Sequence, residues 1–369
     1  MVGALLALLV LTFGIVATPA ASTGPATSPN ISLVQSFAYE AGTDLAFRGR
    51  FIYAAQEGNE GGVHVFELVD DLPRPVSFVS CPGTQNDVAV VRPGLIALGF
   101  FGGECAGADG AGVRLIDVKN PRLPKLLDAV GFPNGAHTIT VFPREPLIYV
   151  SPGGLGENGG TEFILDVSDP RNIEVAGEYT PNPFGCHDVS FHVTEGRALG
   201  FCPGQAETEI WDVANPLSPG LLATIPPHME FPHSAIATPD GDVLVVGDES
   251  LFTAHECVSG RSPTGALWAY DISDPATPIP MGQIASPRGA SAVGTLATPV
   301  CTAHNFNFIP GTRTAVVAWY TGGTSVVLRR PDVSRRGRLL PGGGQRHVVF
   351  LLVQRPHLRE RPQPGSGRP

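Results

Sequence analysis

The sequence predicts an all-β fold, a β-propeller built from four-stranded blades, and three observations support this. The composition combines 45 Gly and 36 Pro with only 16% charged residues, which suits short strands joined by tight turns and is poor in helix formers. A β-rich run that ends in Asp recurs at intervals of roughly 50 residues, the length of a propeller blade. Six strand onsets, which mark six blades, align within this period.

Residues 1–21 predict a secretory signal peptide. From Val2 to Ala17 the chain is apolar apart from Thr12 and two glycines, and small residues follow as far as Ala21. The run is shorter than the roughly 20 residues of a membrane span. An uncleaved anchor is the alternative, because no Lys or Arg precedes the apolar run. We therefore expect a secreted or cell-envelope protein without a membrane span after signal cleavage.

The six cysteines form an even set, as expected for disulfides in an exported chain. Local pairing is the simplest arrangement: Cys81 with Cys105, Cys186 with Cys202, and Cys257 with Cys301. Other connectivities are open from the sequence. A cysteine metal site lacks any C-x-x-C pair.

The recurring unit is a β-rich run, an Asp, a short turn containing Asx or Pro, and a second apolar run. Clear copies begin at Val113, Glu162, Glu209 and Leu267, and a weaker one begins at Val63. Because Asp accepts hydrogen bonds from nearby backbone N–H groups and Pro favours turns, we assign a turn role and no catalytic role to the repeated Asp. These residues are Asp117, Asp166, Asp212 and Asp271.

The first strand of each blade predicts how neighbouring blades pack. Side chains alternate between the two faces of a strand, so one face of these strands carries mainly bulky residues and the other mainly small ones. Such asymmetric faces suit blades stacked one on the next. The bulky residues lie on the same face as the column Thr43, Asn86, His137, His187, His233 and His304. The small residues lie on the same face as the column Asp44, Asp87, Thr138, Asp188, Ser234 and Asn305.

Three further segments, beginning at Gly185, Phe231 and Cys301, carry a family resemblance: GCHDVSFHV, FPHSAIATPDGDVLVVGDES and CTAHNFNFIPGTRTAVVAWYTGGTSVV. Together with the DVSDP-like turns they resemble the bacterial secreted proteins with LVIVD repeats, over roughly Thr43 to Val327. The resemblance implies a secreted propeller of about seven blades, and most members of that family have no assigned chemistry. We accordingly place the propeller at residues 22–328, with its last blade incomplete.

Residues 329–369 depart from the repeat. This segment has ten Arg against only two acidic residues, Asp332 and Glu360. Our hypothesis is a reading frame shifted near Leu328; the alternative is a natural, disordered basic tail that contacts anionic envelope polymers. Without a closing blade, the first and last blades would present open sheet edges, and we expect lower stability than in an intact relative.

The main candidate site is a set of histidines, His137, His187, His233 and His304, at equivalent positions of successive blades. These residues are predicted to meet at one mouth of the central channel, where neutral imidazoles suit a divalent transition metal such as Zn, Cu, Fe or Ni. The ligands must converge on the ion, which residues around a wide ring need not do. The alternative is structural: each ring bonds a neighbouring backbone group or an Asp.

Other motifs give weaker signals. We expect Asp44, Asp87 and Asp188 to bond backbone amides at the strand onsets. Asp248, Glu249, His255 and Glu256 lie in the longest insertion and form either a cation site or a solvated loop. The Gly-rich segment Gly153 to Gly160 lacks the Lys-Ser/Thr of a phosphate-binding loop, and no serine-hydrolase elbow or free nucleophilic Cys is evident.

Two functional classes follow from these observations. The first is an extracytoplasmic recognition or structural module whose partner is a protein or cell-envelope polymer. The second is a metal-binding propeller enzyme, an oxidoreductase or hydrolase, that uses the histidines at the channel mouth. The net charge of −10 argues against a nucleic-acid partner. No recognisable catalytic motif decides between the two classes.

Overall fold

The computed structural model describes most of the repeat region and two short strands in the C-terminal segment. The described residues are 32–38, 42–103, 105, 110–132, 135–152, 160–182, 184–204, 207–226, 229–250, 265–285, 302–320, 323–328, 339–340 and 347–352. Every element named among them is a β-strand. Among these residues there is no helix that is long and apolar enough to cross a membrane.

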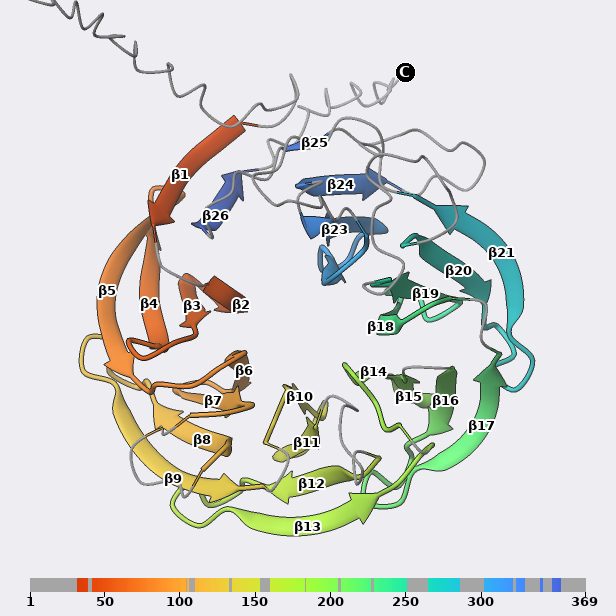
Figure 1. Ribbon diagram of the computed structural model, residues 1–369, viewed down its shortest axis with the longest axis horizontal. Coiled ribbons are helices and arrows are strands. Elements are labelled where there is room, and N and C mark those ends of the chain that lie inside the picture. The colour runs from red at the N-terminus through yellow and green to blue at the C-terminus, as the bar shows by residue number, and fades with distance from the viewer. Residues whose placement is uncertain are drawn as a thin grey trace, which may run out of the picture.

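Six four-stranded antiparallel sheets stand around a central hole (Figure 1), which confirms the predicted all-β propeller and its six blades. The first strand of each sheet faces the hole, and the fourth lies at the outer rim in the sheets where Figure 1 shows it clearly. The inner strands are β2 (Gly42–Arg48), β6 (Asp87–Arg92), β10 (Thr138–Val141), β14 (Ser190–Val193), β18 (Pro232–Ala237) and β22 (Phe306–Phe308).

The remaining strands follow outward in chain order within each sheet. The second strands are β3 (Phe51–Gln56), β7 (Leu95–Phe100), β11 (Leu147–Ser151), β15 (Ala198–Pro203), β19 (Val243–Asp248) and β23 (Thr314–Ala318). The third are β4 (Gly62–Val69), β8 (Gly112–Asp117), β12 (Glu162–Asp166), β16 (Thr208–Asp212), β20 (Leu267–Asp271) and β24 (Thr324–Leu328). The fourth are β5 (Leu72–Ser80), β9 (Lys125–Gly131), β13 (Glu174–Tyr179), β17 (Gly220–Ile225), β21 (Ile279–Ile284) and β25 (Leu339–Leu340).

A separate two-stranded sheet lies between the first and sixth blades (Figure 1). It pairs β1 (Ser32–Ala38) antiparallel with β26 (His347–Leu352). Both β25 and β26 fall within the segment predicted as a tail. The first is the fourth strand of the sixth blade, and the second pairs with β1 in the two-stranded sheet. The domain boundary at residue 328 and the shifted reading frame stay predictions.

The repeated Asp residues make the predicted turns. Each accepts a hydrogen bond from the backbone N–H two residues later, for example Asp166 from Ser168 at 2.8 Å and Asp212 from Ala214 at 2.8 Å. The weaker first copy differs: β4 and β5 are joined through Asp70 and Asp71, which both have positive φ angles of 52° and 61°. Two adjacent left-handed residues are typical of a tight hairpin turn.

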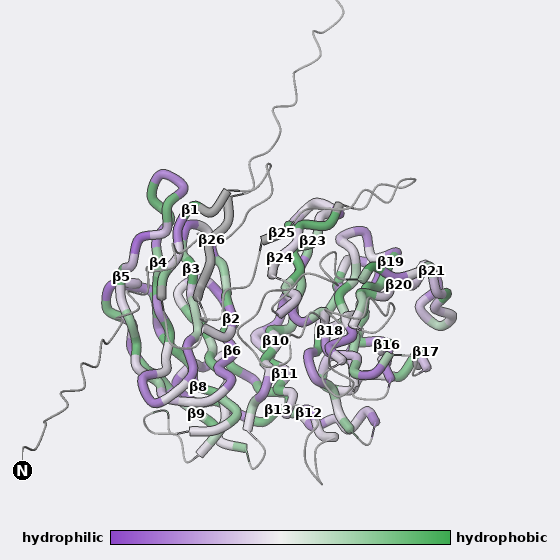
Figure 2. Tube along the Cα trace, turned by 45° about the horizontal axis from the view of Figure 1, so that its top comes forward, coloured by the Kyte–Doolittle hydropathy of each residue, from purple (hydrophilic) through white to green (hydrophobic). Residues whose placement is uncertain are grey.

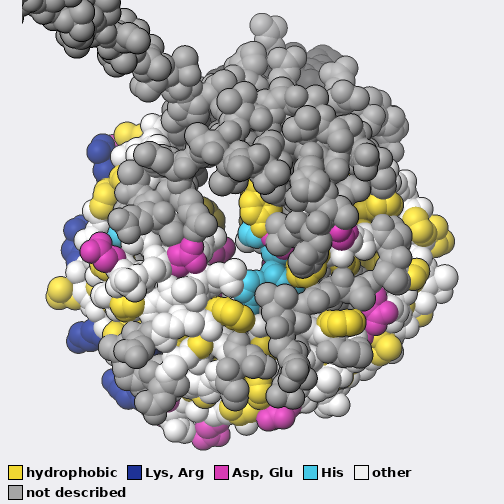
Figure 3. All heavy atoms as spheres, in the orientation of Figure 1, with side chains coloured by type: hydrophobic (Ala, Val, Ile, Leu, Met, Phe, Trp, Pro, Cys, Tyr) yellow, Lys and Arg dark blue, Asp and Glu magenta, His cyan; other side chains and the backbone are white. Residues whose placement is uncertain are grey.

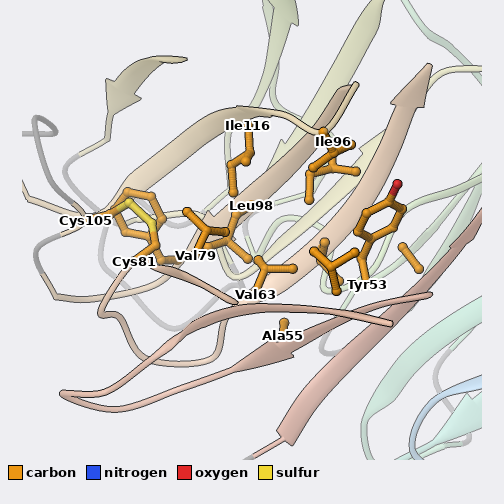
Figure 4. Close-up of a cluster of buried hydrophobic side chains, with 14 residues drawn as sticks. Tyr53, Ala55, Val63, Val79, Cys81, Ile96, Leu98, Cys105 and Ile116 are labelled. Carbon is orange, nitrogen blue, oxygen red and sulfur yellow. A yellow bond between two sulfur atoms is a disulfide. The ribbon is translucent and has the colours of Figure 1, made fainter. Parts of the chain in front are cut away.

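Apolar side chains from adjacent blades form the core between them. In the cluster between the first two blades, Val63 packs with Ile96 and Leu98 (Figure 4). Apolar segments, green in Figure 2, lie along the strands, whereas many of the connecting segments are polar. The predicted stacking of a small face on a bulky face is present: Ala46 of the first blade shares this cluster with Val88 of the second.

Two disulfides close the predicted local pairs, Cys81 with Cys105 and Cys186 with Cys202. Figure 4 shows the first at the edge of the core between the first two blades. The third predicted pair, Cys257 with Cys301, lies outside the described residues. Two disulfides are compatible with an extracytoplasmic location.

Candidate metal centre

The inner-strand onsets of four successive blades place the predicted histidines side by side. Ring centroids are 4.3 Å apart for His137 and His187, 4.0 Å for His187 and His233, and 4.4 Å for His233 and His304. In Figure 3, histidine side chains gather at one wall of the central hole. The structure therefore places the four predicted histidines in one row, each ring next to the following one.

Hydrogen bonds between adjacent blades hold the histidine backbones in this alignment. The hydroxyl of Thr138 donates to the backbone oxygen of His187 at 2.6 Å, and the hydroxyl of Ser234 donates to that of His304 at 3.1 Å. Within its own blade, the amide of His187 donates to the carbonyl of Pro203 at 2.7 Å. The inner strands are thus coupled at the level of the histidines, and their side chains approach one another from fixed positions.

Glu249 adds a carboxylate to the histidines. Its Oε2 lies 3.6 Å from Nε2 of His233, and its Oε1 lies 3.6 Å from Nε2 of His304. The residue directly follows β19 and is 4% exposed. Its neighbour Asp248 is also buried and accepts hydrogen bonds from the amides of Phe231 and Gly265, which anchors the segment that carries Glu249.

The interpretation of this segment as a solvated loop was therefore wrong for Asp248 and Glu249. Both residues are held against the segment before β18, because the Glu249 amide donates to the carbonyl of Phe231 and Asp248 accepts from the Phe231 amide. His255 and Glu256, the other two residues of that prediction, lie outside the described part of the chain, as does nearly all of the Gly-rich segment 153–160.

Three of these residues form a compact set of donor atoms. His187, His233 and Glu249 each offer one ligand atom, and these atoms lie within 4.8 Å of one another. Ligands held at about 2.0–2.2 Å from a tetrahedral ion are themselves about 3.3 Å apart, so shifts of roughly an ångström would close the set around an ion. His137 extends it, because its Nε2 lies 2.9 Å from Nε2 of His187.

The electrostatic environment keeps the imidazoles neutral. Burial lowers the pKa of His137 and of His304 to about 4. Burial, reinforced by the neighbouring imidazoles, holds the pKa values of His187 and His233 well below the usual value. Neutral imidazole is the form that binds metals. Burial also raises the pKa of Glu249 to about 7, against the lowering effect of a hydrogen bond from Tyr320.

Two residues that the sequence did not single out contact the ligand set from outside. Nδ1 of His137 is 3.0 Å from Oε1 of Gln85, and the phenol of Tyr320 donates a hydrogen bond to Oε1 of Glu249. Both have left-handed backbones, with φ of 50° for Gln85 and 46° for Tyr320. Strained residues of this kind concentrate at functional sites, but φ is not visible in a sequence.

The central and flanking histidines differ in exposure. His187 and His233 are 7% and 3% exposed, whereas His137 and His304 are only partly buried. Aromatic rings cover the set: Phe231 packs edge-on against His187 at 5.3 Å, and Phe101 packs against His137 at 5.6 Å. The set is therefore covered at its centre and more accessible at its two ends.

The aspartate column has the structural role expected for two of its members. A carboxylate oxygen of Asp44 accepts the amide of Val88 at 3.1 Å, and one of Asp87 accepts the amide of Ile139 at 2.6 Å. Each bond joins one blade to the next. Burial, together with the charge of Asp44, raises the pKa of Asp188 to about 7. Asp44, Asp87 and Asp188 do not belong to the compact donor set among the described residues.

The fold and the histidine set define a six-bladed propeller with a candidate metal centre in its channel. Similar solved structures include a protein from Lactobacillus plantarum (16% identity, TM-score 0.60) and the periplasmic gluconolactonase of Pseudomonas aeruginosa (14% identity, TM-score 0.59). Each alignment covers 84% of this chain and 88% of the other. A functionally unknown protein from Desulfotomaculum acetoxidans is 12% identical with a TM-score of 0.56. At these identities the likeness shows the fold alone.

No protein-family model matches the sequence, and no curated protein matches it either. The resemblance to the LVIVD family is therefore still a prediction.

Proposed function

We propose that this protein binds a divalent transition metal at the wall of the central channel, beside the onsets of the inner strands. The observation that carries the proposal is the set of His187, His233 and Glu249, whose donor atoms lie within 4.8 Å of one another. Two imidazoles and one carboxylate with open positions are a ligand set used for catalytic transition metals. The metal-binding class, the second of the two that the sequence allowed, is thus the better supported.

In this proposal Nε2 of His233 and Oε2 of Glu249 face the ion from one blade, and His187 faces it from the preceding blade. His137 and His304 supply further imidazoles at the two ends of the set. The fit rests on the chemistry of the donors, because burial lowers the pKa of all four imidazoles and the Glu249 carboxylate lies 3.6 Å from two of them, His233 and His304. A bound ion with an open position would supply Lewis-acid or redox chemistry, consistent with a hydrolase or an oxidoreductase.

Metal analysis of natively purified protein tests the proposal. We expect close to one equivalent of a transition metal, and a loss of most of it in His187→Ala and His233→Ala. The matched control is His192→Ala, because His192 lies on β14 outside the donor set. Less than about a tenth of an equivalent in the wild type after incubation with Zn²⁺, Cu²⁺, Fe²⁺ or Ni²⁺ and desalting, unchanged in the two variants, would contradict a metal site of this class.

The second candidate function is the extracytoplasmic recognition or structural module. It is favoured by the outer strand β21, on which Ile279 and Ile284 are 58% and 49% exposed. Apolar side chains on an outer strand suit contact with a protein or a cell-envelope polymer. The signal peptide, secretion and membership of the LVIVD family belong to this proposal. A pull-down from envelope extracts tests it, with charged substitutions at Ile279 and Ile284 as the control.

A further inference from the structure

We propose that Tyr320 is a positioning residue of the metal centre, which fixes how Glu249 presents its carboxylate to the ion. This inference rests on the proposed metal-binding function. Tyr320 lies just after β23, the second strand of the sixth blade, whereas Glu249 directly follows β19 of the fifth blade. The contact therefore joins two blades at the site.

The two oxygens of Glu249 have different surroundings. Oε1 accepts the hydrogen bond from the phenol of Tyr320 and lies 3.6 Å from Nε2 of His304, whereas Oε2 lies 3.6 Å from Nε2 of His233. A carboxylate with one oxygen engaged by a donor presents mainly the other oxygen to an ion. The geometry therefore favours binding through Oε2 alone, on the side of His187 and His233.

A residue with a left-handed backbone lies at Tyr320 itself and directly after Glu249. Tyr320 has φ of 46°, and Ser250, which directly follows Glu249, has φ of 35°. Residues other than Gly adopt this region at a cost in free energy and keep it only where the surroundings enforce it. A left-handed backbone at the donor residue and directly after the acceptor residue indicates that the contact is built into the site.

Contacts of Tyr320 itself and of its neighbour Trp319 hold Tyr320 in position. Its neighbour Trp319 is fully buried, and the indole N–H donates to the hydroxyl of Ser325 at 2.7 Å. The ring of Tyr320 packs on that of His304 with centroids 4.8 Å apart, and the amide of Gly323 donates to the Tyr320 carbonyl at 3.0 Å. The phenol is thus held against the donor set although the residue as a whole is 39% exposed.

The test is a Co²⁺ and Zn²⁺ titration of the full chain against a chromophoric chelator. Partners that orient metal ligands typically contribute 10- to 100-fold in affinity, so we expect Tyr320→Phe to weaken binding by about that factor and to change the visible spectrum of bound Co²⁺. Tyr179→Phe is the matched control, because Tyr179 lies on β13 and packs on Trp211 away from the histidines.

A second variant separates positioning from packing. Tyr320→Leu removes the ring together with the hydroxyl, whereas Tyr320→Phe removes the hydroxyl alone, so positioning through the hydroxyl predicts that Tyr320→Phe already shows most of the loss in affinity. Affinity and Co²⁺ spectrum unchanged in Tyr320→Phe would overturn the role of Tyr320 and leave the metal site standing. A wild-type protein that binds neither Co²⁺ nor Zn²⁺ would overturn both.

Discussion

Nε2 of His137 and Nε2 of His187 lie 2.9 Å apart, although 50 residues separate them in the sequence. Two ring nitrogens at this distance either share a proton or face a common cation, because two lone pairs would repel each other. The contact of His137 Nδ1 with Gln85 suits the first ring as a donor at Nδ1, which leaves its Nε2 as an acceptor. Nε2–H of His187 then donates to it, and an ion bound between the two rings would take the place of this proton.

Metal binding is expected to stabilise the folded protein. An ion that binds only the native state at 100 times its Kd adds about 2.7 kcal/mol, because the donors come from different blades and separate on unfolding. We expect Zn²⁺ to raise the Tm of the wild type by several degrees and to raise that of Glu249→Gln much less. Differential scanning calorimetry with and without EDTA measures this, and equal shifts in both proteins would contradict it.

The central and flanking histidines are expected to differ in their contribution to affinity. His187 and His233 belong to the compact donor set, whereas His137 and His304 lie at its two ends. His187→Ala or His233→Ala should abolish measurable binding, and His137→Ala or His304→Ala should weaken it by a smaller factor. Isothermal titration with Zn²⁺ compares the four variants. Stronger effects at the ends than at the centre would place the ion elsewhere along the row.

The disulfide between Cys186 and Cys202 is expected to stabilise the fourth blade beside the site. The cross-link spans 16 residues, and a loop of this size contributes about 3 kcal/mol by restricting the unfolded chain. Replacing both cysteines with Ala should lower the free energy of unfolding by about that amount in urea titrations. The matched control is the double replacement of Cys81 and Cys105, which should act on the first two blades and leave Zn²⁺ affinity unchanged.

Glu162 is expected to make stability depend on pH. Burial raises its pKa to about 8, although hydrogen bonds from Ser151 and from the Cys186 amide act in the opposite direction. The folded state therefore holds a proton that the unfolded state releases near pH 4.5, and the stabilisation present at low pH is lost as the pH rises through about 8.

In Glu162→Gln this titration is absent. The free energy of unfolding of the variant minus that of the wild type should increase from pH 5 to pH 8 and level off above, with a slope of at most about 1.4 kcal/mol per pH unit. Glu178→Gln, at an exposed carboxylate of the adjacent strand β13, is the control. Parallel curves for wild type and Glu162→Gln would show that Glu162 is ionised in the folded protein.

Much of the fold is readable from the sequence because its signals are local. The Asp that ends each third strand bonds an amide two residues away, as Asp271 does with Ser273 at 2.9 Å, so the turn is encoded within a few positions. Likewise, the alternation of side chains along the inner strands places Ala46 and Val88 on faces that meet. The histidine column follows from the same period.

The composition of the site, in contrast, depends on contacts between blades. Glu249 and Tyr320 are 71 residues apart and occupy no shared position in the repeat, so no spacing in the sequence connects them. Whether His137, His187, His233 and His304 come within reach of one ion depends on the width of the ring, which is set by how closely successive blades pack. Local turn chemistry and strand alternation thus specify the blades, whereas the packing of blades around the channel decides which side chains meet there.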